Sequence, residues 1–146
     1  MNTLLTLSAG ELEVVVAPEI AGSIARFDRS TPGERVQLMC GAAGGSCNVL
    51  DAACFPLVTF ANRIRGGKFS CDGIDIVLAP NSPPDPSPMH GQGWRGIWQV
   101  EYANATSIRL IFNHNAGEWP WNYVARQVLK LDAAGLSATL TCCNLW

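Results

Sequence analysis

The sequence predicts an all-β fold, an antiparallel sandwich or barrel of about nine or ten short strands. Apolar residues alternate with polar ones at period two or gather in short runs, as in strands. Gly, Pro, Asn and Asp interrupt these runs every few residues, as turns do. No window of about 11 residues keeps a helical period, so no helix is predicted.

The first predicted strands alternate with turn-forming residues. Residues 12–16 are β-branched and stop at Pro18, residues 22–27 follow, and residues 35–39 come after the turn Thr31-Pro32-Gly33-Glu34. Residues 41–46 are a flexible Gly/Ala stretch.

A second group of strands is predicted around two tight turns. Residues 55–64 form a long apolar strand, and Gly66-Gly67 separates it from residues 68–71. Asp72-Gly73 separates that segment from residues 74–78. Two-residue Gly-Gly and Asp-Gly loops supply the positive φ angles of hairpin turns, so this part predicts a β-meander.

A loop over residues 79–93 contains Pro80, Pro83, Pro84, Pro86 and Pro88, which excludes a central strand there. The strand pattern then resumes. Trp94, Trp98, Val100 and Tyr102 fall on one face, and Ile108, Leu110 and Phe112 alternate with polar residues. The last two strands are predicted at residues 123–131 and 136–143.

Composition restricts the class of protein. The chain has 146 residues, 48% of them hydrophobic and 15% charged, which predicts one folded domain over residues 1–146. A net charge of −2 without a basic run argues against a nucleic-acid partner. No apolar stretch reaches the ~18 residues of a membrane span, and the start lacks the basic region of a signal peptide. The expected location is therefore the cytoplasm.

The six cysteines are expected to be reduced, packing residues. There is no export signal, Cys142 and Cys143 are adjacent, and no pair has the C-x-x-C spacing of zinc or redox sites. No metal and no cofactor are predicted. The motifs of nucleotide binding, serine hydrolysis and zinc proteolysis are also absent.

Two residues stand out as candidates for chemistry. His90 lies between a proline-rich stretch and Gly91, next to Trp94, and a stiffened loop of this kind suits a ligand pocket. Arg63 interrupts an otherwise apolar strand, where it either reaches solvent or donates to ligand oxygens. The second histidine, His114, is interpreted as a surface or packing residue.

Five tryptophans are many for this length. Such rings stack on the apolar faces of sugars but more often fill sandwich cores. Trp98 is assigned to the core, and the sequence leaves Trp94, Trp119 and Trp121 open.

Several motifs, taken together and in order, resemble those of the aldose 1-epimerase (galactose mutarotase) family. They are G-E-L-E-V at 10–14, P-E-I-A-G-S-I at 18–24, F-P-L-V-T-F-A-N-R-I at 55–64 with G-K-F at 67–69, H-G-Q-G-W at 90–94, and W-P-W-N-Y at 119–123. The resemblance covers essentially the whole chain.

This resemblance implies a galactose mutarotase-like antiparallel β-sandwich, of which residues 1–146 correspond to the first half. It also implies a sugar substrate such as a hexose, and interconversion of the α and β anomers of a free aldose by paired acid–base catalysis without cofactors. Arg63 matches the family's substrate-binding arginine, Asn62 precedes it in the same motif, and His90 matches the first active-site histidine.

The chain ends at Trp146, before the family's second histidine and its glutamate base, so catalysis is expected to be impaired. There are two alternatives to the epimerase interpretation. The chain is either a non-catalytic carbohydrate-binding sandwich or an inactive fragment that self-associates through exposed sheet edges. A phosphorylated sugar stays open too, because Arg65, Lys68 and Arg95 could bind a phosphate.

Overall fold

The computed structural model describes residues 3–41, 46 and 48–145. Most of the predicted Gly/Ala stretch, and Cys47, lie outside the described residues. The described part contains ten strands and two short 3₁₀ helices. They are β1 (Leu5–Ala9), β2 (Leu12–Ala17), β3 (Ser23–Thr31), β4 (Glu34–Met39), η1 (Val49–Asp51), η2 (Arg65–Gly67), β5 (Lys68–Cys71), β6 (Ile74–Val77), β7 (Gln99–Ala103), β8 (Ser107–His114), β9 (Tyr123–Asp132) and β10 (Gly135–Asn144).

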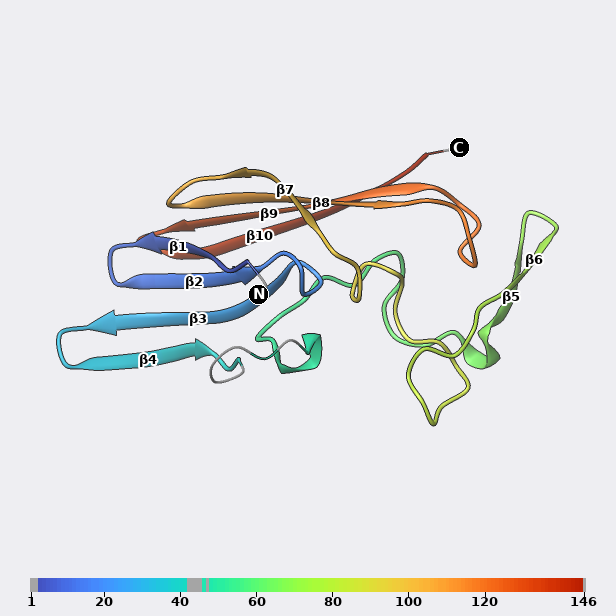
Figure 1. The fold of residues 1–146 in the computed structure, drawn as a ribbon, viewed down its shortest axis with the longest axis horizontal. Helices are drawn as coiled ribbons and strands as arrows, with labels where there is room; N and C mark the ends of the chain where they lie inside the picture. Colours follow the sequence, from blue (N-terminus) through green and yellow to red (C-terminus); the bar gives the residue numbers. More distant parts are fainter. Residues whose placement is uncertain (1–2, 42–45, 47, 146) are drawn as a thin grey trace.

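Two four-stranded antiparallel sheets dominate the fold, in the orders β1-β2-β3-β4 and β10-β9-β8-β7 (Figure 1). The all-β antiparallel prediction is therefore confirmed. Strand β1 was not predicted, although its Leu5 and Leu7 share one face. Its pairing with β2 supplies the hydrogen bonds that five residues could not make alone.

The core lies where β1–β3 face β8 and β9, as in a sandwich. Val14 and Val16 of β2 point into it, whereas Glu13 lies on the outer face, because side chains alternate along a strand. Trp98 is 1% exposed and joins this core, as predicted. The buried cluster comprises Leu7, Val14, Val16, Ile24, Val58, Trp98, Ile108, Leu110, Tyr123, Ala125, Leu129 and Leu131.

The predicted strand from Trp94 to Tyr102 is only partly correct. The strand begins at Gln99, and Trp94 lies in a turn before it. Val100 and Tyr102 do not share the burial of Trp98: they are 44% and 50% exposed. The pairing of β7 with β8 shifts between these two residues, and such an irregularity breaks the simple alternation of faces.

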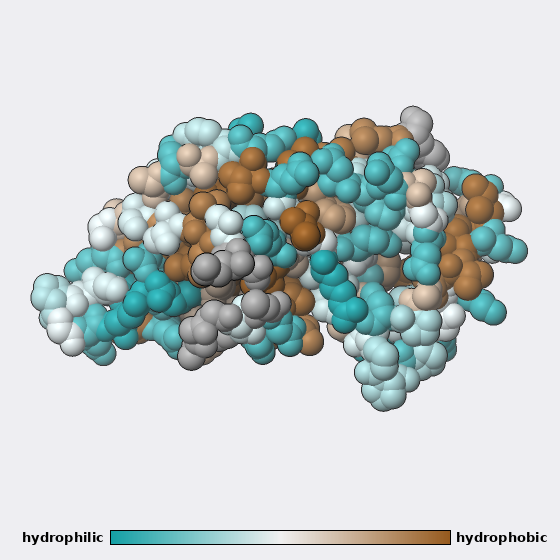
Figure 2. Space-filling view, in the orientation of Figure 1, coloured by the Kyte–Doolittle hydropathy of each residue, from teal (hydrophilic) through white to brown (hydrophobic). Residues whose placement is uncertain are grey.

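Strands β5 and β6 form a separate hairpin that extends from the end of the molecule opposite the β3–β4 turn (Figure 1). Asp72 and Gly73 turn the chain with φ of 51° and 77°, as the Asp-Gly signal predicts. The prediction of a hairpin turn at Gly66-Gly67 is wrong, because these glycines belong to η2. Hydrophobic surface gathers on this hairpin (Figure 2), where Ile74 and Val77 are exposed.

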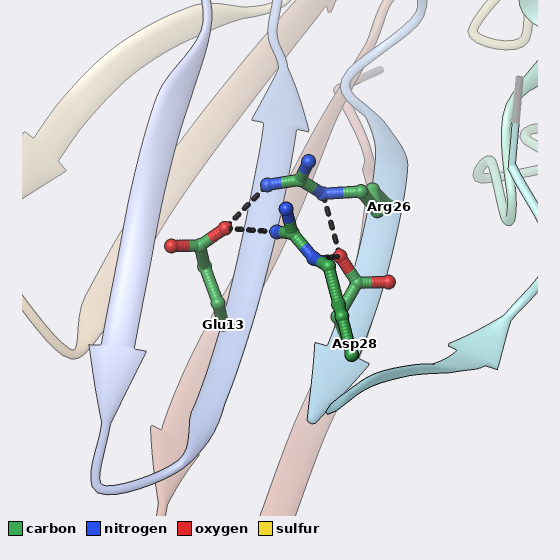
Figure 3. Close-up of polar contacts among 4 residues, drawn as sticks. Glu13, Arg26 and Asp28 are labelled. Carbon is green, nitrogen blue, oxygen red and sulfur yellow. Dashed lines mark hydrogen bonds and ion pairs between the residues drawn. The ribbon is translucent and has the colours of Figure 1, made fainter. Parts of the chain in front are cut away.

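A charged cluster covers the outer face of the first sheet (Figure 3). The carboxylate of Asp28 is fully buried, and its Oδ2 lies 2.8 Å from Nε of Arg26 and 2.8 Å from Nε of Arg35. The same two arginines also pair with Glu13. A buried carboxylate is tolerated here because two guanidinium groups neutralise it.

The cysteines within the described residues are free, as expected, but they are not packing residues. Cys40, Cys54, Cys142 and Cys143 are exposed, and Cys71 is partly exposed. Cys142 and Cys143 lie in the exposed part of β10, the edge strand of its sheet among the described residues, where no facing layer covers their side chains. No helix within the described ranges is long and apolar enough to cross a membrane.

Among the described residues, β10 pairs on one side only, with β9, and its other edge has no partner strand. All ten of its residues pair with β9 without a register shift, and none of them is charged. Its Leu140 lies opposite the buried Gln127 and continues the same face, yet it is 42% exposed. A long, regular and uncharged edge strand favours pairing with another strand.

We therefore expect the chain to self-associate with rising concentration, and Leu140→Lys to weaken this assembly by placing a charge on the edge. Sedimentation velocity over a concentration series measures the effect. Ala133→Lys, in the exposed β9–β10 turn, adds the same charge away from the edge and is the control. A wild-type chain that stays monomeric throughout the series would contradict the expectation.

Candidate active site

The candidate site is built by two segments that run antiparallel without forming a regular ladder. Residues 58–64 and 88–93 exchange backbone hydrogen bonds, among them His90 N–H to Asn62 C=O at 2.7 Å and Gly91 N–H to Phe60 C=O at 3.1 Å. The predicted strand over residues 55–64 is therefore wrong. Asn62 has a φ of 66° and His90 a φ of 59°, and residues in this left-handed region cannot continue a strand.

His90 and Asn62 are bonded to each other twice. Besides the backbone bond above, the Asn62 N–H donates to Nδ1 of the His90 ring at 2.8 Å. A nitrogen that accepts a hydrogen bond carries no proton, so this bond assigns the proton of the neutral ring to Nε2. The ring meets the Trp94 ring edge-on, with 5.3 Å between centroids. The sequence-predicted pair is thus in direct contact, and Nε2–H is left as a donor.

Arg63 is held by the proline-rich loop. Its Nη1 donates to the Ser87 carbonyl at 2.7 Å, and its Nε lies 3.3 Å from Oδ2 of Asp85. The Ser87 N–H donates to Asp85, which together with the charge of Arg63 keeps the pKa of that carboxyl below its usual range. The prediction that this loop contains no central strand is confirmed, and two of its residues, Asp85 and Ser87, hold the Arg63 side chain.

A depression opens beside His90, and Arg63 is not among the residues that line it. The lining residues include Phe60, Asn81, His90, Gln92, Trp94, Arg95 and Glu118. Sequence reasoning missed Asn81, Gln92 and Glu118, which lie in loops without any periodic signal. Of the three cationic residues considered for a phosphate, Arg95 is the one that lines the depression, with its guanidinium 4.4 Å from the Trp94 ring centroid.

The tryptophans that the sequence left open lie in or beside the site, since Trp94 lines the depression and Trp119 contacts the lining residue Phe60. Trp94 is buried, whereas Trp119 and Trp121 are half-buried and contact each other at 5.3 Å between centroids. His114 stacks on Tyr123 at 4.8 Å, and its Nε2 donates to the Trp119 carbonyl at 3.1 Å. The interpretation of His114 as a packing residue agrees with this position. No cluster of three or more metal-ligating side chains occurs among the residues described.

Burial lowers the pKa of His90, and the positive charge of Arg63 lowers it further. Asp85 pairs with Arg63, and Arg95 and Glu118 line the same depression as His90. A lowered pKa means that folding favours the neutral ring. Its contribution to stability is complete above the ordinary value and is lost as the pH falls through the lower, folded-state value.

We expect an NMR titration to place the midpoint of His90 below 6.5, the ordinary value. Arg63→Met is expected to raise the midpoint only partway, because burial is the larger cause. His114→Gln identifies the signals of the second histidine. A His90 midpoint at or above 6.5 would show that this environment does not favour the neutral ring.

Proteins of one known family resemble this chain in sequence and in fold. The sequence profile of the aldose 1-epimerase family matches residues 4–145. The uncharacterized protein YphB of Escherichia coli K12 is 37% identical over 143 residues, which cover 97% of this chain and 46% of YphB. The crystal structure of a putative aldose 1-epimerase from E. coli K12 is 35% identical, with a TM-score of 0.87, over 100% of this chain and 47% of that one.

More distant structures share the fold. A galactose mutarotase-like protein from Clostridium acetobutylicum superposes with a TM-score of 0.80 at 15% identity, over 99% of this chain and 46% of that one. The chain therefore spans about half the length of the relatives that it matches. The family profile nonetheless covers nearly the whole chain. This chain belongs to the aldose 1-epimerase family.

Proposed function

We propose that this chain binds an aldose, such as a free hexose, in the depression beside His90, as one half of an aldose 1-epimerase site. The observation that carries the proposal is the bond from Asn62 N–H to Nδ1 of His90, which leaves Nε2–H as the donor of a residue lining the depression. In this proposal Nε2–H donates to a sugar oxygen near the reacting carbon. Neither Arg63 nor Asn62 lines the depression, so their predicted contacts with sugar oxygens require the sugar to extend past His90 toward residues 62–63.

The reaction of such a site is the exchange of α and β anomers. A base removes the proton of the C1 hydroxyl, an acid protonates the ring oxygen, and the bond between C1 and the ring oxygen breaks to give the open aldehyde. Rotation about the C1–C2 bond and closure then give either anomer. No electrons are exchanged with another molecule. The acid gives one proton and the base takes one, and ring closure reverses both transfers, so the sugar keeps its composition.

The neutral His90 ring suits only part of this chemistry. With its pKa lowered, it stays uncharged near neutral pH, so Nε2–H stabilises developing charge on an oxygen rather than delivering a proton. The family's general acid and glutamate base lie beyond the motifs that this chain matches. We therefore propose sugar binding for the 146-residue chain, with anomer exchange close to the spontaneous rate.

Polarimetry on freshly dissolved α-glucose and α-galactose, against a buffer blank, tests the catalytic part of the proposal. Binding is measured separately from the tryptophan fluorescence, because Trp94 contacts His90. We expect a rate equal to the blank, together with saturable binding that His90→Ala removes. His114→Gln is the matched control, since His114 contacts Trp119 and Tyr123 rather than lining the depression.

The two alternatives give other results. A rate above the blank that disappears in His90→Ala would mean that this half of the site is sufficient for catalysis, and the proposal of impaired exchange would be wrong. Absence of both binding and exchange, together with concentration-dependent assembly, would favour the inactive fragment. The third outcome is saturable sugar binding without anomer exchange, even when the other half of the site is added. This outcome would favour a non-catalytic carbohydrate-binding sandwich.

A further inference from the structure

The side chain of Asn81 is bonded to the backbone immediately before His90. Its Oδ1 accepts the N–H of Met89 at 2.7 Å, and its Nδ2 donates to the C=O of the same residue at 2.8 Å. A planar amide that satisfies both backbone groups of one residue acts as a neighbouring strand would. Met89 thus obtains from a side chain the support that a regular sheet gives through the backbone.

This support matters because His90 has an unusual conformation. Its φ of 59° is one that a residue with a side chain rarely adopts, and such a conformation persists only where the surroundings hold it. On one side, Asn62 bonds to the backbone N–H and to the ring of His90. On the other side, Asn81 bonds to Met89. The orientation of the ring therefore depends on two anchors, and Asn81 is the one outside the recognised motifs.

We propose that Asn81 is a positioning residue for His90: by clamping Met89 it holds the ring with Nδ1 on the Asn62 amide and Nε2–H toward the depression. The relevance to sugar affinity rests on the proposed function, whereas the orientation of the ring does not. Asn81 itself lines the depression and is partly buried. Loss of the clamp frees the backbone on the entry side of His90, and small displacements of a binding group weaken its interactions strongly.

The test compares Asn81→Ala with Asn104→Ala. Asn104 is a matched control, because its Oδ1 also makes two bonds to backbone, to the N–H groups of Thr106 and Ser107, in the β7–β8 turn. The first readout is the ¹⁵N spectrum of the histidine rings, which distinguishes a protonated from an unprotonated Nδ1. Only two histidines are present, so His114→Gln assigns both sets of signals. The second readout is the dissociation constant for glucose and galactose.

In the wild-type chain we expect an unprotonated Nδ1 and a protonated Nε2 for His90. In Asn81→Ala we expect a mixture of the two neutral tautomers, a titration midpoint closer to 6.5, and a dissociation constant raised roughly tenfold or more. Asn104→Ala is expected to change none of these. A folded Asn81→Ala chain whose His90 signals and midpoint match the wild type would overturn the proposal.

Asn81→Asp covers the case in which the alanine variant does not fold. Aspartate keeps the acceptor for the Met89 N–H but lacks the donor for the Met89 carbonyl, so intermediate changes in the His90 signals are expected. Wild-type signals in that variant would equally overturn the proposal. If instead His90→Ala leaves sugar affinity unchanged, the proposed function fails, while the ¹⁵N signals still decide whether Asn81 positions the ring.

Discussion

Replacing Gly91 with alanine is expected to destabilise the chain by about 3 kcal/mol and to displace His90. An added Cβ would lie 1.9 Å from the backbone nitrogen of Thr59 and 2.0 Å from the carbonyl oxygen of Val58. Both atoms belong to the main chain and cannot rotate away as a side chain can. The two segments of the site would have to separate, which breaks the bond from Gly91 N–H to the Phe60 carbonyl.

Chemical denaturation measures the loss of stability, and the ¹⁵N signals of His90 measure the displacement. Gly117→Ala is the control, because its added Cβ has only the Asn115 carbonyl oxygen nearby, at 3.9 Å. We expect that control to change the free energy of unfolding by less than about 0.5 kcal/mol. If Gly91→Ala were as stable as the control, the close approach of residues 58–59 to Gly91 would be refuted.

The second large effect is expected when Asp28 loses both of its partners. The double change Arg26→Ala and Arg35→Ala would leave a fully buried carboxylate without a countercharge (Figure 3). Breaking a buried ion pair in this way costs about 3–5 kcal/mol. Such a loss is a large fraction of the roughly 5–15 kcal/mol by which domains are stable.

Removing Asp28 instead of the two arginines should cost less stability. Asp28→Ala removes the buried charge and leaves two arginines that are 32% and 47% exposed, still paired with Glu13 and accessible to water. Adding Asp28→Ala to the double variant should therefore recover part of the lost stability, as denaturation of the four proteins would reveal. If the triple variant were the least stable of the four, the uncompensated charge of Asp28 would not be the cause.

Local sequence patterns were sufficient for most of the fold. The alternation of Ile108 and Leu110 predicted β8, and Asp72-Gly73 predicted the turn between β5 and β6. Such features are encoded locally, because side-chain alternation and positive φ each depend on a few consecutive residues. Strand β1 was missed since its five residues are stabilised chiefly by pairing with β2, which a local pattern does not reveal.

The candidate site also has features that the sequence predicted and features that only the structure revealed. By itself, the sequence determined the family resemblance and the candidates Asn62, Arg63 and His90, because the residues of each motif are close together in the chain. Only the tertiary structure decided that residues 55–64 are not a strand and that Asn62 donates to Nδ1 of His90 across 28 positions. The clamp of Asn81 on Met89 also emerged only there. Bonds between a polar side chain and a distant backbone have no periodic signature, and they form only when packing brings two segments into register.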